Sequence, residues 1–166
     1  MTLKKLGEFK FIERVAKGLK TSAGVVKGIG DDTAVLKYKK SGYMLFTCDM
    51  LVEDKHFRRS AGGYLIGRKS LSAGISDIAA MGGEPKFALI SAGMPASLES
   101  KYAGNIYRGI KYVAGKYDVD LVGGDTVSSE KIVVNVALLG EVEKKNLVLR
   151  SGAEAGDVIF VTGSVG

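Results

Sequence analysis

The chain has 166 residues, of which 46% are hydrophobic and 25% are charged, and its formal net charge is +6. This size and mixture are typical of one globular domain; no apolar run is long enough to span a bilayer, and the N-terminus lacks the apolar core of a signal peptide. The lone cysteine excludes an internal disulfide, and the basic pairs are scattered along the chain, so we expect a cytoplasmic protein with no membrane or nucleic-acid partner.

The first predicted element is an amphipathic helix. Apolar residues recur at three- and four-residue steps from Leu6 to Leu19, which predicts a helix over residues 4–20. Short strands separated by glycine and lysine turns are then expected over residues 25–26, 34–38 and 43–48. The next helix has one apolar face, marked by Leu71, Ile75 and Ile78, and ends near Met81.

The second half of the chain also contains both predicted strands and a predicted helix. An extended run over residues 87–91 is followed by a predicted helix over 98–117, a short strand over 119–122 and a long apolar strand over 131–142. Strands and helices do not alternate strictly. The expected class is therefore α+β, with a mixed or antiparallel sheet that carries its helices on one face.

The last residues are interpreted as the start of a second domain. Residues 150–157 are turn-like, residues 158–161 are predicted to form a buried strand, and residues 162–166 are predicted to form a glycine-rich loop. A strand followed by such a loop normally leads into another element. We therefore expect a first domain over residues 1–145, and a truncated second α/β domain that begins at residues 146–166.

One glycine-rich segment resembles a phosphate-binding loop without matching it. Residues 62–70 read GGYLIGRKS, which has one residue too many before the lysine and no strand ahead of it. The P-loop needs strand, loop and helix in register to cradle phosphate. This segment is therefore interpreted as an ordinary helix start.

The acidic motifs are the stronger signal. Aspartates follow or end apolar segments, mostly beside glycine or a small polar residue, in GDD (30–32), TCD (47–49), SD (76–77) and GGDT (123–126). Such positions can converge at one edge of a sheet, where several carboxylates repel each other unless cations lie between them. Magnesium is the natural cation for carboxylate and phosphate oxygens. The set predicts a metal–phosphate site.

These motifs, in this order and spacing, resemble the thiamine-monophosphate kinase family. The resemblance rests on GIGDDTAVL, TCDMLVEDKHF, SDIAAMGGEPKFALISAGMP, LVGGDT and LRSGAEAGDVIFVTGSVG. It covers the chain as the N-terminal half of a protein about twice as long. It implies ATP-dependent phosphorylation of thiamine monophosphate to thiamine diphosphate, with magnesium as cofactor. It also implies a homodimer, in which the sheets of two chains pair into a barrel.

The resemblance also implies roles for single residues. The family's magnesium ligands correspond to Asp32, Thr47, Asp49, Asp77 and Asp125. Its ATP-contacting positions correspond to Tyr107, Gly124, Asp125 and Arg150, and its substrate-binding histidine corresponds to His56. No residue is assigned as a general acid or base, because the acceptor is already a phosphate anion. Successive side chains of an extended segment point to opposite sides, so Asp31 is expected in a turn or supporting role.

Two departures from the family pattern limit what is implied. Cys48 stands where the family usually has serine or threonine, and a thiol is a poor magnesium ligand. The C-terminal half, with further aspartates, is absent. Two alternatives therefore stay open. The chain could belong to another ATP-using enzyme of the wider superfamily, such as aminoimidazole ribonucleotide synthetase, selenophosphate synthetase or the hydrogenase-maturation type. It could also be a dimerisation and nucleotide-binding fragment that is inactive alone.

Overall fold

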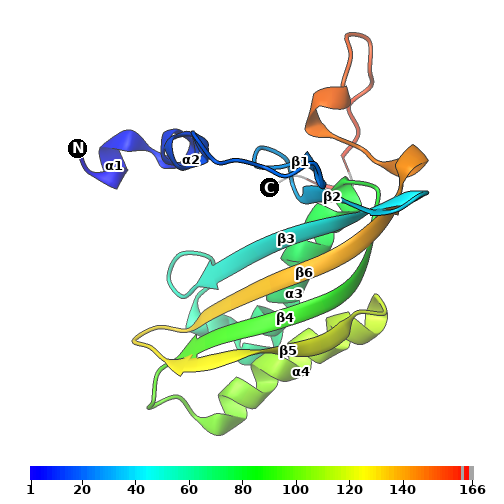
Figure 1. Ribbon diagram of the computed structural model, residues 1–166. Helices are drawn as coiled ribbons and strands as arrows, with labels where there is room; N and C mark the ends of the chain where they lie inside the picture. Colours follow the sequence, from blue (N-terminus) through cyan, green and yellow to red (C-terminus); the bar gives the residue numbers. More distant parts are fainter. Residues whose placement is uncertain (162, 165–166) are drawn as a thin grey trace.

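A mixed sheet carries the candidate site. The structure, a computed structural model, describes residues 1–161, 163 and 164. Within these residues the sheet has six strands in the order β1-β2-β3-β6-β4-β5 (Figure 1). Neighbouring strands are antiparallel except β4 and β5, which are parallel. The expected α+β class with a mixed sheet is confirmed.

The elements have these bounds. The strands are β1 (Val25–Lys27), β2 (Ala34–Lys39), β3 (Gly42–Val52), β4 (Glu84–Met94), β5 (Asp120–Ser128) and β6 (Val133–Glu143). The helices are α1 (Leu3–Leu6), α2 (Glu8–Ala16), α3 (Gly63–Ala80) and α4 (Ser100–Lys116). Short 3-10 turns lie at Arg59–Ala61, Lys144–Asn146 and Arg150–Gly152.

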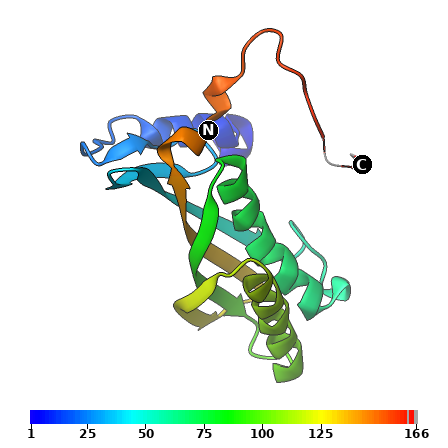
Figure 2. The ribbon, with the colours of Figure 1, turned by 90° about the vertical axis from the view of Figure 1, so that its right-hand side faces the viewer.

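The two long helices cover one face of the sheet. Figure 2 shows α3 and α4 together on the same side of the strands. Side chains alternate between the two faces of a strand. In β6, Val134, Val136 and Leu138 are therefore fully buried toward the helices, while the residues between them are half-buried. The hydrophobic core lies in this helix–sheet layer.

The other face of the sheet is open and apolar. Directly opposed residues form rows across the strands, such as Phe46–Leu139–Phe87 and Cys48–Ala137–Leu89. Phe46, Phe87 and Leu89 are 43%, 44% and 46% exposed. This surface, called the open face below, lies away from α3 and α4.

The GGD motif lies inside a strand. The crossover β4–α4–β5 returns the chain parallel to β4 and makes β5 the edge strand. Gly123 and Gly124 have φ of 154° and 155°, and a Cβ at Gly124 would lie 1.8 Å from the carbonyl oxygen of Ile90. Only glycine fits so close to β4, so β5 runs through the glycines where the sequence predicted a strand ending before them.

The N-terminal helix is shorter than predicted and stands off the sheet. Gly7, with φ of 79°, divides it into α1 and α2, and α2 buries no residue.

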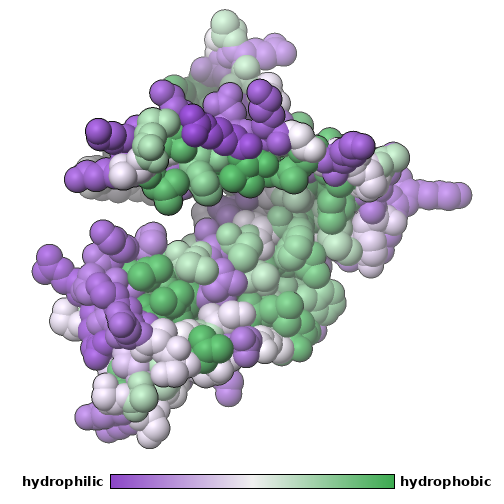
Figure 3. Space-filling view, turned by 60° about the vertical axis from the view of Figure 1, so that its left-hand side comes forward, coloured by the Kyte–Doolittle hydropathy of each residue, from purple (hydrophilic) through white to green (hydrophobic). Residues whose placement is uncertain are grey.

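The surface of the molecule is hollowed. In Figure 3, apolar side chains gather on both sides of a deep notch in the molecule. Within the part of the chain that the structure describes, no helix is both long and apolar enough to cross a membrane.

The prediction of a buried strand over residues 158–161 is wrong. These residues belong to no strand, and Val158, Ile159, Phe160 and Val161 are 72%, 92%, 86% and 64% exposed. A strand needs a neighbour to satisfy its backbone groups, and no described segment pairs with this run. The predicted glycine-rich loop at 162–166 falls partly on Thr162, Val165 and Gly166, which lie outside the described residues.

Candidate functional site

A group of polar side chains meets between β3, α3 and the loop before β2. The Thr47 hydroxyl on β3 donates to Asp77 Oδ2 on α3 at 2.8 Å, and Thr47 is only 9% exposed. Asp49, two residues further along β3, faces the same side as Thr47. Asp32, in the loop that enters β2, also acts on Asp77 through its charge. We call Asp32, Thr47, Asp49 and Asp77 the acidic cluster.

The electrostatics of the acidic cluster favour a cation. Burial raises the pKa of Asp77 above its usual value, and repulsion from Asp49 and Asp32 raises that pKa further. The Thr47 hydroxyl and the charge of Arg150 act in the opposite direction. A carboxylate that is half-buried near two others is stabilised by any positive charge brought close to it.

Arg150 supplies one such charge in this structure. Its Nη2 contacts Asp32 Oδ1, and it reaches the cluster from the 3-10 turn at Arg150–Gly152. The segment before this turn is docked on the domain, because the Val148 amide donates to the Met81 carbonyl at 3.2 Å. The structure therefore brings Arg150 together with the acidic cluster.

Asp31 occupies a different environment from Asp32. Its side chain is 1% exposed. Its Oδ1 accepts the Asp32 amide at 3.1 Å and the Arg150 amide at 3.4 Å, and its Oδ2 lies 3.9 Å from Lys27 Nζ. Asp31 thus supports the loop and anchors the chain near Arg150, while Asp32 belongs to the acidic cluster.

His56 lies apart from the acidic cluster, in the loop after β3. It is exposed, and its Nδ1 accepts the Val52 amide at 2.9 Å. Lys69 Nζ on α3 donates to the His56 carbonyl at 2.5 Å. The loop follows the C-terminal end of β3, an inner strand of the sheet (Figure 1). His56 is therefore held by its backbone and one ring nitrogen.

The predicted ATP-contacting residues of α4 and β5 form a second group. Tyr107, Gly124 and Asp125 line a hollow of about 440 Å³ together with Lys111. Lys111 is one helical turn beyond Tyr107, so both reach the same hollow from α4. The sequence interpretation missed Lys111, although its spacing from Tyr107 is the signal that would have found it.

The structure keeps these two groups apart. Asp49 and Gly124 are the ends of one row across the sheet, Asp49–Val136–Ile90–Gly124. Three strand spacings separate them, about 14 Å at the usual spacing. Asp125 is opposed to Ser91, which is opposed to Asn135, so on the edge strand Asp125 borders the open face as well as the hollow. Convergence of all the aspartates at one edge is not observed.

The donors of the acidic cluster suit magnesium. They are all oxygen atoms from carboxylates and a hydroxyl, which hard cations prefer. Among the described residues, no three His, Cys, Asp or Glu side chains lie close enough to hold a metal ion as they stand. The donor chemistry and the raised pKa of Asp77 fit the ion, and a bound polyphosphate would have to supply the remaining ligands.

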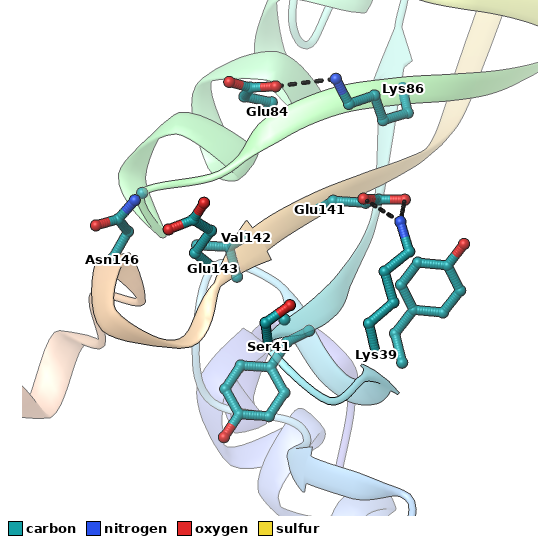
Figure 4. A pocket seen from close by; sticks show the side chains of 12 residues that line it. Lys39, Ser41, Glu84, Lys86, Glu141, Val142, Glu143 and Asn146 are labelled. Atoms are coloured by element: carbon teal, nitrogen blue, oxygen red, sulfur yellow. Dashed lines mark hydrogen bonds and ion pairs between the residues drawn. The ribbon is translucent and has the colours of Figure 1, made fainter.

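Two other features carry none of the predicted site residues. Cys48 lies on the open face, where its thiol donates to Asn135 Oδ1 at 3.2 Å. A hollow of about 370 Å³ near the start of β4 is bordered by the ion pairs Lys39–Glu141, at 3.0 Å, and Lys86–Glu84, at 2.9 Å (Figure 4). These charges already satisfy one another.

The chain matches known proteins over its whole length. Residues 30–142 match the family model of AIR synthase related protein, N-terminal domain. A thiamine-monophosphate kinase of Aquifex aeolicus is 43% identical over 166 residues, and one of Bacillus subtilis is 40% identical over 163 residues. These matches cover 100% and 97% of this chain but 52% and 50% of the relatives. The chain thus spans about half the length of the curated relatives it matches.

A solved structure gives the same result. AaThiL complexed with AMPPCP and TMP superposes with a TM-score of 0.84 at 42% sequence identity. The superposition covers 93% of this chain and 47% of that chain. The sheet, the helices and the loops that carry the candidate site are therefore those of a known architecture.

Proposed function

Because the chain belongs to the family of AIR synthase related proteins, we propose that it forms the N-terminal half of a magnesium-dependent thiamine-monophosphate kinase. The observation that carries the proposal is the whole-length match, at 43% identity, to such a kinase. A relative that holds AMPPCP and TMP supports ATP as co-substrate and thiamine monophosphate as acceptor. The sequence relatives do not favour another enzyme of the superfamily.

The acidic cluster is the proposed binding site for magnesium and the triphosphate. Asp32, Thr47, Asp49 and Asp77 would hold magnesium at the cluster, and Asp125 would join from β5 through a metal-bound nucleotide that spans the distance between them. When bound, the ion supplies positive charge to the phosphate oxygens between which the phosphoryl group moves. The contact of Arg150 with Asp32 supports a role for its guanidinium at the terminal phosphate.

The remaining residues are proposed to orient the two substrates. Tyr107 and Gly124 border the hollow of about 440 Å³, which would accept the nucleoside end of ATP. His56 would donate to the phosphate of thiamine monophosphate. The acceptor oxygen is already ionised, so positioning and charge neutralisation suffice and no residue has to remove a proton.

The proposal extends to assembly and location. Apolar residues on the open face, including Phe46, Met50 and Leu89, support pairing of two sheets into a dimeric barrel. The exposed apolar run at 158–161 supports a second domain that begins at residues 146–166 after a first domain over residues 1–145. The lone cysteine, Cys48, fits a cytoplasmic location.

The test is release of ADP from ATP in a coupled assay with thiamine monophosphate, on the full-length protein. We expect turnover that depends on added magnesium. Turnover with an aminoimidazole ribonucleotide precursor or with selenide, and none with thiamine monophosphate, would overturn the assignment.

A second measurement concerns the 166-residue chain alone. The chain spans about half of its relatives, and its two groups of site residues are separate. We expect this chain to dimerise and to bind nucleotide without turnover. Measurable kinase activity from it would contradict this part of the proposal.

A further inference from the structure

The loop that carries His56 is tightly ordered by its own backbone. The amides of Lys55 and His56 both donate to the Val52 carbonyl, at 3.1 and 2.9 Å. The Asp54 amide donates to the Phe57 carbonyl at 2.8 Å, and Asp54 has φ of 65°. A non-glycine residue in this left-handed region needs surrounding contacts that hold it there.

Glu53, the residue before Asp54, ties the start of the loop to its end. Its side chain is 9% exposed, and its two carboxylate oxygens accept Arg59 Nε and Nη2, both at 2.8 Å. Oε2 also accepts the Ile132 amide at 3.0 Å, ahead of β6. The Arg59 carbonyl in turn accepts the Tyr102 hydroxyl of α4 at 2.6 Å. The two ends of the loop are thus tied to each other and to two neighbouring elements.

The charge on Glu53 is kept in spite of burial. Hydrogen bonds from Arg59 lower the pKa of Glu53 and outweigh the opposing effect of burial. The pair adds little net stability, because Glu53 loses its water on burial while the Arg59 side chain, 44% exposed, keeps much of its own. Its advantage here is geometric, since the planar guanidinium fixes the distance and angle between residues 53 and 59.

The ordered loop also holds one nitrogen of the His56 ring. The Val52 amide donates to Nδ1, so Nδ1 carries no proton and the ring proton of the neutral imidazole is on Nε2. Among the described residues, Nε2 has no hydrogen-bond partner, and His56 is exposed. The ring therefore offers one N–H donor to solvent from a fixed direction.

We propose that Glu53 is a positioning residue, whose pair with Arg59 holds His56 as the Nε2–H tautomer, ready to donate to a phosphate monoester. The identity of that monoester as thiamine monophosphate rests on the proposed function; the positioning itself does not. Neither Glu53 nor Arg59 is assigned to the binding of nucleotide, metal or substrate.

His56 is the chain's only histidine, which makes the test direct. Long-range ¹H–¹⁵N spectra of the labelled chain near pH 8, where an ordinary imidazole is neutral, report the tautomer without assignment. We expect the Nε2–H pattern in the parent chain. Glu53→Gln and Arg59→Lys should move the two ring nitrogens toward a common, averaged shift. The matched control is Glu84→Gln, which removes an exposed ion pair at the opposite end of the sheet and should leave the pattern unchanged.

The outcomes separate the inference from the proposed function. An averaged tautomer in the parent chain, or an unchanged Nε2–H pattern in both folded variants, would overturn the role of Glu53. If Glu53→Gln does not fold, comparing the ring-nitrogen spectrum of Arg59→Lys with that of the parent chain still tests the role of the pair. Thiamine monophosphate should shift Nε2 more than inorganic phosphate does at equal concentration. A fixed tautomer with no such shift supports the positioning role and counts against the proposed substrate.

Discussion

Asp31 and Asp32 are adjacent, yet their carboxylates do different things. Asp31 is buried and accepts backbone amides from Asp32 and Arg150, whereas Asp32 faces the acidic cluster and contacts Arg150 Nη2. The sequence motif shows two acids at a strand entrance and predicts that they diverge. The partner that they share, Arg150, comes from the far end of the chain, so residues near 31 do not reveal it.

We expect Asp32→Asn to weaken magnesium-dependent binding of ATP at least tenfold, a loss of about 1.4 kcal/mol, because a charged cluster residue is removed. Asp31→Asn should weaken it by less than about threefold and should lower the free energy of unfolding by about 1 kcal/mol, since its hydrogen bonds are structural. Titration calorimetry with and without magnesium measures the binding, and urea unfolding measures the stability. The reverse order of the binding effects would refute this distinction.

Asp77 gives a prediction about pH. Burial raises the pKa of Asp77 in the folded chain above its ordinary value, so its contribution to stability is full below the unfolded pKa and is lost as pH rises through the folded pKa. Without added metal, Asp77→Asn should therefore raise the Tm at pH 7, and this gain should shrink as the pH falls toward 4. Thermal unfolding from pH 4 to 8 measures the difference. The exposed Asp120→Asn is the control, and an equal gain in both variants would contradict the explanation.

At the scale of elements, α3 and α4 approach so closely that glycine is required at the contact. A Cβ at Gly67 would lie 1.9 Å from the Ile106 carbonyl oxygen, and one at Gly109 would lie 2.1 Å from the Tyr64 carbonyl oxygen. Gly67 is part of the segment that resembles a P-loop, and its role is helix packing. Helical periodicity predicts both helices, but it does not reveal which glycines meet.

Gly67→Ala should lower the free energy of unfolding by about 1–3 kcal/mol, because backbone atoms of α4 cannot move aside cheaply. Gly104→Ala, on α4 with nothing within 4 Å of the added Cβ, should instead raise it by up to about 1 kcal/mol through helix propensity. Urea unfolding of both variants gives the comparison. Equal stability of the two would show that the helix contact tolerates a side chain.

At the scale of the whole molecule, the open face is linked to the separation of the two groups of site residues. The sheet exposes apolar rows on the side away from α3 and α4, and Asp125 on the edge strand borders that side. A second chain on this face would lie next to Asp125 and Met50 and would cover the exposed apolar side chains. The apolar character of these strands follows from the sequence, but their arrangement into one continuous surface follows from strand order.

Leu89→Glu should convert a dimer into a monomer, because it places a charge at the centre of the open face, where Leu89 is 46% exposed. The control is Leu65→Glu on α3, with Leu65 similarly exposed at 53% but remote from that face. Sedimentation velocity measures the mass against the 17.5 kDa of one chain. A parent chain that sediments as a monomer, or a Leu65→Glu variant that also dissociates, would contradict this interface.

The sequence by itself determined what depends on neighbours along the chain. Periodicity predicts α3 and α4 and the positions of the strands, because side-chain direction repeats every 3.6 or every 2 residues. Turn chemistry places acids at element ends, and the ordered motifs indicate the family. Only the tertiary structure decided which acids come together: Asp32 and Asp49 lie near Asp77, while Asp125 lies apart on β5. That choice depends on strand register and on the crossover through α4, which long-range contacts set and local pattern does not encode.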